Sequence, residues 1–236
     1  MMDRPVIFGT GLSSAIGQAL LARLTSRYQV VALGRTPMGM GDTVFIEADF
    51  RRPLATWRPT VESWLHSSKP EVVGFVHLAG VVYSDALEAT TEDEWRSMVD
   101  VNLSAALGLG QLLSSWFSSG GSVVLVGSVD AQYSSQAGRA AGYGASKAGL
   151  KGLMRHWAAE WGKRNIRVNG IAPGALTVGM SVQDHAIEAS LRQRIALQRL
   201  GRADEVAAVI DFLLSPAASY LTGAWIPVDG GLNLSY

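Results

Sequence analysis

With 236 residues, 48% of them hydrophobic and 17% charged, the chain is long enough for one large α/β domain and too apolar to be disordered. Its 20 basic and 20 acidic residues cancel, which argues against a nucleic-acid partner or an anionic membrane surface. Cysteine is absent, the histidines lack metal-ligand spacing and no apolar run could span a bilayer, so we expect a cytoplasmic protein without metal or membrane partners.

Short apolar runs alternate with amphipathic segments along the whole chain. Residues 5–11, 13–27 and 29–35 read as strand, helix and strand, a unit whose strands pair in parallel. Further strands are predicted at 43–49, 71–80, 121–128, 166–174 and 224–231, and helices at 53–66, 91–117, 143–164, 184–195 and 203–214. The alternation predicts one domain over residues 1–236: an α/β Rossmann fold with a doubly wound, seven-stranded parallel sheet and helices on both faces.

The first strand-to-helix turn is glycine-rich, with the sequence GTGLSSAIG over residues 9–17. Gly11 can adopt backbone angles closed to other residues, and Gly17 lets the helix pack close to the sheet. Ser13, Ser14 and the free amides of the helix start could bind a pyrophosphate. A glycine turn needed only for packing is the alternative.

The end of the second strand indicates which dinucleotide would bind. An acidic residue there would bind the ribose hydroxyls, but the sequence has Gly34 followed by Arg35. Arg35 can pair with a 2′-phosphate, which favours NADP(H) over NAD(H), unless it is only a surface arginine. Asp49 closes the third strand, where it could accept from an adenine amine or simply cap a turn.

Tyr143 and Lys147 lie one helical turn apart among small residues in the stretch AGYGASKAGL. A free phenol is a poor base near neutrality because its pKa is about 10, and a nearby ammonium favours the phenolate. The pair suits proton donation to a carbonyl oxygen while hydride arrives at its carbon. A surface pair with no role is the alternative.

Two further polar residues stand where chemistry is expected. Ser128 ends a strand, at the sheet edge where ligands bind, and could hydrogen-bond a reacting oxygen. Asn102 is an amide inside an apolar helical stretch. A turn serine and a satisfied core amide are the alternative interpretations.

Eight segments in order resemble the short-chain dehydrogenase/reductase family in its compact single-domain form, and in particular its 3-ketoacyl-carrier-protein reductases and related carbonyl reductases. They are TGLSSAIG, HLAG, VDVNL, VLVGS, YGASK, RVNGIAPG, LGRADEVA and LTGAWIPVDGG. The resemblance covers residues 6–232. It implies the same fold and an oxidoreductase.

The resemblance also implies roles by position. Tyr143 would be the catalytic acid/base, Lys147 would lower its pKa and hold the nicotinamide ribose, and Ser128 would orient the reacting oxygen. Asn102 would hold the water of a proton relay. Tyr143 and Lys147 would share the cofactor site with Gly11, Ser13, Ser14, Ile16, Gly17, Arg35, Asp49, Phe50, Ala79, Gly80, Pro173 and Gly174.

Some positions depart from the family pattern. Ala15 replaces the middle glycine of the turn, and His77 and Leu78 replace paired asparagines, so the central strand must be supported differently. After Gly174, the family's threonine on the nicotinamide amide corresponds to Val178, which puts that contact in doubt.

The segment from Ser128 to Tyr143 is about two residues longer than the family usually has, and it borders the substrate. Polar side chains there predict a more polar specificity: Asp130, Gln132, Tyr133 and Gln136. A substrate lid is expected over about 178–200, with Met180 as a substrate contact.

The function expected is hydride transfer between NADP(H) and a ketone or secondary alcohol, in a homotetramer or homodimer. Among enzymes, a ketoacyl-thioester reductase competes with a reductase of a specialised metabolite. A nucleotide-binding regulator or assembly subunit without catalysis is the alternative from another class.

Overall fold

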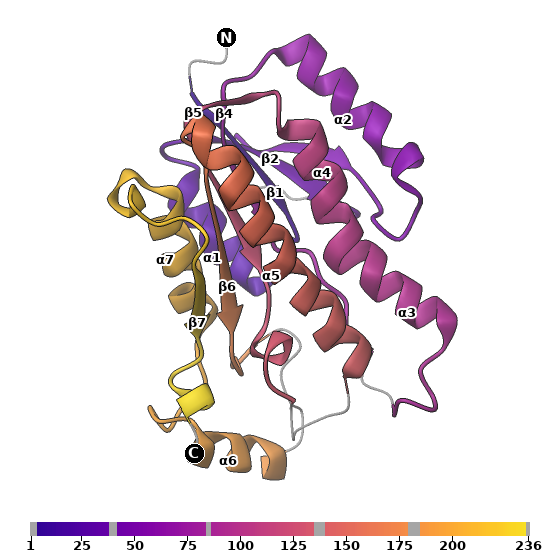
Figure 1. Cartoon of the computed structure of the whole chain (residues 1–236), viewed down its shortest axis with the longest axis vertical. Helices are drawn as coiled ribbons and strands as arrows, with labels where there is room; N and C mark the ends of the chain where they lie inside the picture. The colour runs from indigo at the N-terminus through magenta and orange to yellow at the C-terminus, as the bar shows by residue number, and fades with distance from the viewer. Residues whose placement is uncertain (1–3, 38–41, 84–85, 135–139, 179–184, 235–236) are drawn as a thin grey trace.

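The computed structural model describes residues 4–37, 42–83, 86–134, 140–178 and 185–234 (Figure 1). Two expected substrate contacts, Gln136 and Met180, lie outside these ranges. None of the helices in the described part of the chain has the length and apolar character that a membrane span requires.

Seven parallel strands form one sheet in the order β3-β2-β1-β4-β5-β6-β7, which confirms the predicted Rossmann topology. The strands are β1 Val6–Thr10, β2 Gln29–Gly34, β3 Val44–Glu47, β4 Val72–His77, β5 Phe117–Val126, β6 Arg167–Pro173 and β7 Trp225–Val228. Because the order reverses between β1 and β4, ligands are expected beyond the carboxyl ends of these two strands.

Seven α-helices cover the described chain: α1 Ala15–Leu24, α2 Leu54–Ser68, α3 Glu92–Val99, α4 Ala105–Leu113, α5 Ala141–Trp161, α6 His185–Arg194 and α7 Ala203–Leu214. Alternate residues of β1 face opposite layers. Ile7 packs in a core with α1 and α7, whereas Phe8 packs in a core with α2, α4 and α5. The sheet is thus buried on both faces, as its continuous apolar strands require.

The long helix predicted over 91–117 is interrupted and ends early. A π-helical segment, Asp100–Ser104, separates α3 from α4, and α4 ends at Leu113. The residues before 121 instead begin β5, because Phe117 pairs with Val72 before the register shifts. Apolar spacing continues through the π segment, so the sequence pattern alone did not reveal it.

Helix α6 lies beyond the carboxyl ends of β6 and β7 (Figure 1). It belongs to the segment expected to form a lid. Leu191 and Ile195 from this helix pack with Leu200 in a small apolar cluster separate from the two main cores.

Candidate active site

The turn between β1 and α1 approaches its neighbours too closely for side chains. Gly11 has a φ of +66°, and a Cβ there would lie 2.5 Å from the backbone nitrogen of Ala79. A Cβ on Gly17 would lie 2.3 Å from the Cα of Leu12. Both positions therefore require glycine, Gly11 for its backbone conformation as well as for space.

Ser13 and Ser14, at the start of α1, differ in what their hydroxyls can bind. The Ser14 hydroxyl accepts from the Gly17 amide at 3.2 Å and donates to the Gly11 carbonyl at 2.8 Å. The single proton of the Ser14 hydroxyl is therefore used in a hydrogen bond within the turn. Ser13 is exposed and lines the neighbouring cavity, so it is the better placed of the two to meet a ligand.

A cavity of about 250 Å³ opens where this turn meets the ends of β2, β3 and β4. Eight of the expected cofactor residues line it: Gly11, Ser13, Ser14, Arg35, Asp49, Phe50, Ala79 and Gly80. Ile16 and Gly17 are not among its lining residues, and Gly17 acts instead by bringing α1 close to the sheet.

Charged side chains gather at the β2–β3 end of the cavity. Asp49 accepts two hydrogen bonds from the Arg51 guanidinium, at 3.0 and 2.8 Å. These bonds hold the pKa of Asp49 below its usual value, and the charge of Arg35 contributes in the same direction. Arg35 itself is exposed beside Gly34, where even an added Cβ would meet nothing within 4 Å.

Arg51 is the lining residue that the sequence interpretation missed. Arg51 directly follows Asp49 and Phe50 in the sequence. A second arginine just after the third strand could therefore have been predicted to line the cavity. Because its charge is paired with Asp49, the carboxylate is less free for an adenine amine than the sequence suggested.

Gly80 connects the cavity to the Tyr-Lys pair. It lines the cavity, and a Cβ on it would lie 3.1 Å from the Lys147 Nζ and 3.5 Å from the Asn102 Oδ1. Lys147 is 2% exposed, and its ammonium donates to the Val126 carbonyl at 2.9 Å. The same nitrogen lies 5.8 Å from the centre of the Tyr143 ring.

Tyr143 is 7% exposed, and burial raises its pKa to about 12. A hydrogen bond with the Ser128 hydroxyl acts in the lowering direction, and the charge of Asp130 acts in the raising direction. Burial lowers the pKa of Lys147 to about 8. In the chain alone, Lys147 therefore does not produce the lowered Tyr143 pKa that the resemblance implied, because burial of the phenol dominates.

Ser128 is bonded to its own neighbour. Its hydroxyl donates to the Asp130 carboxylate at 3.0 Å and accepts from the Asp130 amide at 3.2 Å. Both residues lie where β5 passes into a short 3₁₀ turn, Val129–Ala131. Burial raises the pKa of Asp130, and the Ser128 bond partly opposes that rise.

Asn102 sits in the π segment with its side chain fully engaged. Its amide donates to the Val81 carbonyl at 3.0 Å and to the Ser146 hydroxyl at 2.9 Å, while its Oδ1 accepts from the Val81 amide at 2.8 Å. The side chain thus ties the segment that follows β4 to α5.

His77 replaces the family's asparagine by bonding to Thr10. The Thr10 hydroxyl accepts from the amides of Leu78 and Ala79, at 3.1 and 3.0 Å, so its proton goes to the His77 Nδ1, 3.0 Å away. His77 is fully buried, with its Nε2 lacking a hydrogen-bond partner among the described residues. Burial, with the charge of Lys147, lowers its pKa to about 3.

The carboxyl end of β6 lies at the same edge of the parallel sheet as the strand ends described above. Pro173 is buried, and the Gly174 amide donates to the Val228 carbonyl at 3.1 Å. A Cβ on Gly174 would lie 2.7 Å from the Cβ of Asp229. Neither residue lines the cavity at the β1 turn. Val178 is 40% exposed, and Thr177 is bonded through its backbone to Gly201.

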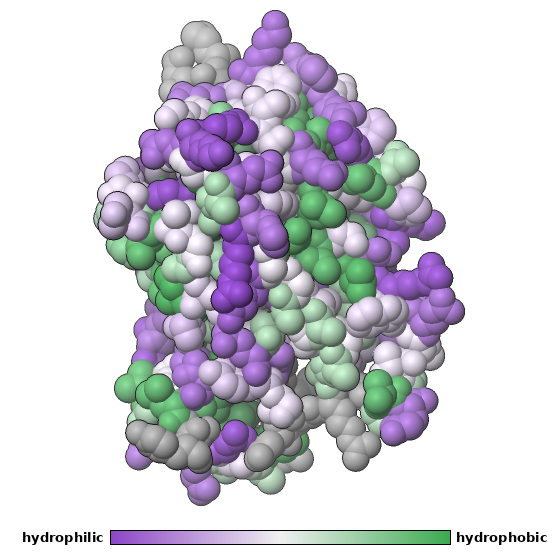
Figure 2. All heavy atoms as spheres, in the orientation of Figure 1, coloured by the Kyte–Doolittle hydropathy of each residue, from purple (hydrophilic) through white to green (hydrophobic). Residues whose placement is uncertain are grey.

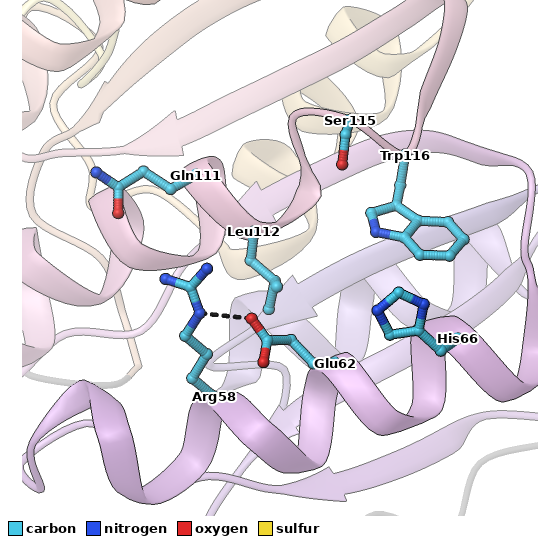
Figure 3. Close-up of a pocket in the computed structure, with 7 residues that line it drawn as sticks. All are labelled: Arg58, Glu62, His66, Gln111, Leu112, Ser115 and Trp116. Atoms are coloured by element: carbon cyan, nitrogen blue, oxygen red, sulfur yellow. Dashed lines mark hydrogen bonds and ion pairs between the residues drawn. The ribbon is translucent and has the colours of Figure 1, made fainter.

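A second cavity, of about 400 Å³, lies between α2 and the end of α4 (Figure 3). There Arg58 donates to Glu62 at 2.6 Å, and the rings of His66 and Trp116 meet edge to face. It contains none of the residues expected to act on a substrate. Within the described residues, no group of His, Asp and Glu side chains is arranged to hold a metal ion.

Comparisons with known proteins identify the family. A family model described as enoyl-(acyl carrier protein) reductase matches residues 40–233. The 3-oxoacyl-[acyl-carrier-protein] reductase MabA of Mycobacterium tuberculosis is 33% identical over 231 residues, covering 96% of this chain and 92% of its own. The chain belongs to the short-chain dehydrogenase/reductase family.

Other members of this family show the same breadth of coverage. The 3-oxoacyl-[acyl-carrier-protein] reductase FabG of Pseudomonas aeruginosa is 32% identical and covers 96% of both chains. A short-chain dehydrogenase/reductase from Serratia marcescens superimposes with a TM-score of 0.87 at 28% identity, covering 98% of both chains. The protein is therefore an oxidoreductase of this family.

Proposed function

We propose that this oxidoreductase transfers a hydride between NADP(H) and a ketone or secondary alcohol, with Tyr143 as acid/base. The observation that carries the proposal is the position of Gly80, which lines the cavity beside the glycine turn and lies next to the Lys147 ammonium. A dinucleotide lying in that cavity would bring its reactive ring toward Tyr143 and Ser128.

The residues around the cavity fit a dinucleotide. Gly11 lets the turn pack against the Leu78–Ala79 backbone beside the cavity, and the amides that begin α1 are suited to a pyrophosphate. When bound, the nicotinamide would supply or accept the hydride. Arg35 supports NADP(H) over NAD(H), because it is exposed, lines the cavity at the end of β2 and could pair with a 2′-phosphate, whereas Arg51 is paired with Asp49.

The proton states suit reduction. A Tyr143 phenol with a pKa of about 12 is protonated near neutrality and can donate its proton to a carbonyl oxygen that receives hydride at its carbon. Ser128 would hold that oxygen. Lys147, with a pKa of about 8, carries its charge near neutrality and would hold the nicotinamide ribose while stabilising negative charge on the phenol oxygen.

The relatives named as 3-oxoacyl-acyl-carrier-protein reductases support a ketoacyl thioester as one candidate substrate. A relative from Arabidopsis thaliana, 29% identical and named a tropinone reductase homolog, supports a small ketone instead. A catalytically silent role is disfavoured because Tyr143, Lys147 and Ser128 are all present and brought together.

We also propose that residues 1–236 act as one domain whose segment at about 178–200 covers the substrate, and that the chain forms a homotetramer or homodimer. Apolar residues gather along α4 and α5 on the face shown in Figure 2. Trp95 and Leu107, from α3 and α4, remain 43% and 40% exposed, which favours burial against another copy. Light scattering would give the oligomeric state.

Substitution of Tyr143 by phenylalanine tests the proposed function. We expect Tyr143→Phe to bind NADPH normally but to reduce ketones about 10²–10⁴-fold more slowly, since only the transferred proton is removed. Tyr28→Phe, a change of the same size at a tyrosine beside Arg27, should keep full activity. Equal rates in wild type and Tyr143→Phe would overturn the assignment.

A further inference from the structure

Asp130 occupies a position that the proposed reaction does not by itself explain. Its carboxylate lies 3.0 Å from the Ser128 hydroxyl, in the 3₁₀ turn that follows β5. It is partly buried, and the ion pairs among the described residues do not include it. A carboxylate thus stands, without a cationic side chain bound to it there, next to the hydroxyl that would hold the substrate.

Asp130 and a substrate carbonyl would compete for the same Ser128 hydroxyl proton. Ser128 has one hydroxyl proton, and in the chain alone that proton points to Asp130 while the Asp130 amide points to the same oxygen. A carbonyl oxygen that binds Ser128 needs the same proton. A substrate must therefore compete with Asp130, unless it gives the carboxylate another donor.

The charge of Asp130 is a second reason for a hydrogen-bond donor on the substrate. Burial already disfavours the charged form of Asp130, and its charge disfavours ionisation of Tyr143. An acceptor-only or anionic group beside the reacting carbonyl would meet this carboxylate unfavourably. A hydroxyl or ammonium group would satisfy it.

The distance sets where the donor must lie. The Ser128 oxygen and the Asp130 oxygen are 3.0 Å apart. From standard bond lengths, a carbonyl oxygen and a hydroxyl or amine on the adjacent carbon are about 2.6–2.9 Å apart when they point the same way. Two parallel hydrogen bonds, one to each residue, therefore match a vicinal arrangement.

We propose that Asp130 is a specificity-determining residue that selects ketones with a hydrogen-bond donor, a hydroxyl or an ammonium group, on the carbon next to the carbonyl. The donor binds the carboxylate and releases the Ser128 proton to the carbonyl oxygen. The inference rests on the proposed function, since Ser128 must hold the reacting oxygen. It ranks simple 3-oxoacyl thioesters, which lack a donor there, as poorer substrates.

Matched ketones test the inference. Wild type should reduce an α-hydroxy ketone with about 10–100-fold higher kcat/KM than the ketone without the hydroxyl, the range expected for a hydrogen bond to a charged group. In Asp130→Ala this ratio should fall toward 1, and Asp130→Asn, which keeps an acceptor but no charge, should be intermediate. Asp93→Ala, an exposed carboxylate on α3, should keep the wild-type ratio.

A binding measurement separates failure of this inference from failure of the proposed function. Calorimetry compares a vicinal diol with the matching secondary alcohol, each added to the NADPH complex, where neither can react. Tighter diol binding in wild type and not in Asp130→Ala supports the recognition role even if no ketone is reduced, a result that would overturn only the reductase. Ketone reduction without a preference, or with a preference that survives in Asp130→Ala, overturns the inference and leaves the reductase standing.

Discussion

A phenol with a pKa of about 12 keeps its proton throughout the physiological pH range. For Tyr143 this makes the chain ready to donate a proton, while removing one requires further stabilisation of the phenolate. The Lys147 ammonium lies 5.8 Å from the centre of the Tyr143 ring and donates to the Val126 carbonyl. Under the proposed function, this protonated phenol would serve as the acid that donates to a carbonyl oxygen.

The burial of His77 predicts how the free energy of unfolding changes with pH. Its pKa is about 3 in the folded chain and about 6.5 when unfolded, so the unfolded chain binds more protons between these values. Stability should therefore fall as pH drops below 6.5, by up to roughly 1.4 kcal/mol per pH unit from this residue. Chemical denaturation at pH 4.5–7 should show a shallower pH dependence for His77→Asn than for wild type.

His66 provides the control for this prediction. It lies on α2 against Trp116, and His66→Asn should keep the wild-type slope. Parallel pH profiles for wild type and His77→Asn would show that His77 is not buried in its neutral form.

Several properties of individual residues could be predicted from the sequence. The need for glycine at 11 and 17, and the approach of Tyr143 to Lys147, followed from spacing on a β-α-β unit and on one helix. The Ser128–Asp130 bond and the raised Tyr143 pKa did not, because they depend on burial and on loop geometry rather than on spacing.

At the scale of elements, α1 packs closely against the turn that follows β1. Gly17→Ala should displace α1, because the new methyl group would meet the Leu12 backbone at 2.3 Å. We expect lower thermal stability and weaker nucleotide binding. The cost should be at least 1–3 kcal/mol, as for other overpacked sites.

Gly152 in α5 is the matched control. A Cβ there meets nothing within 4 Å, so Gly152→Ala should stabilise the chain by about 0.4–1 kcal/mol through its effect on the unfolded state. Denaturant unfolding of the two variants should shift the midpoint in opposite directions. A shift of the same sign in both would contradict the close packing at Gly17.

The elements themselves were largely predictable, since alternating apolar runs and amphipathic segments determine a parallel sheet. The exceptions have a local cause. The π segment at Asp100–Ser104 contains Asn102, whose side-chain partners, Val81 after β4 and Ser146 in α5, lie far away in sequence. Such long-range contacts leave no trace in the periodicity of one helix.

For the whole molecule, a dinucleotide would join three strand ends around one cavity and so stabilise the fold. A ligand at 100 times its Kd adds about 2.7 kcal/mol. NADPH should therefore raise Tm, and should do so more than NADH at equal concentration. Arg35→Ala should remove the difference between the two, whereas Arg52→Ala, an exposed arginine nearby, should preserve it. Equal shifts with both nucleotides in wild type would contradict the NADP(H) preference.

The most direct test of the central claim follows the hydride. NADPH carrying deuterium at both hydrogen positions of its reactive carbon is supplied with a panel of α,β-unsaturated ketones, which offer both a carbonyl and a carbon–carbon double bond, and the products are examined by mass spectrometry and NMR. We predict an allylic alcohol with deuterium on the carbinol carbon, formed by wild type and not by Tyr143→Phe. A saturated ketone with deuterium on a former alkene carbon, or no transfer of deuterium, would contradict the account.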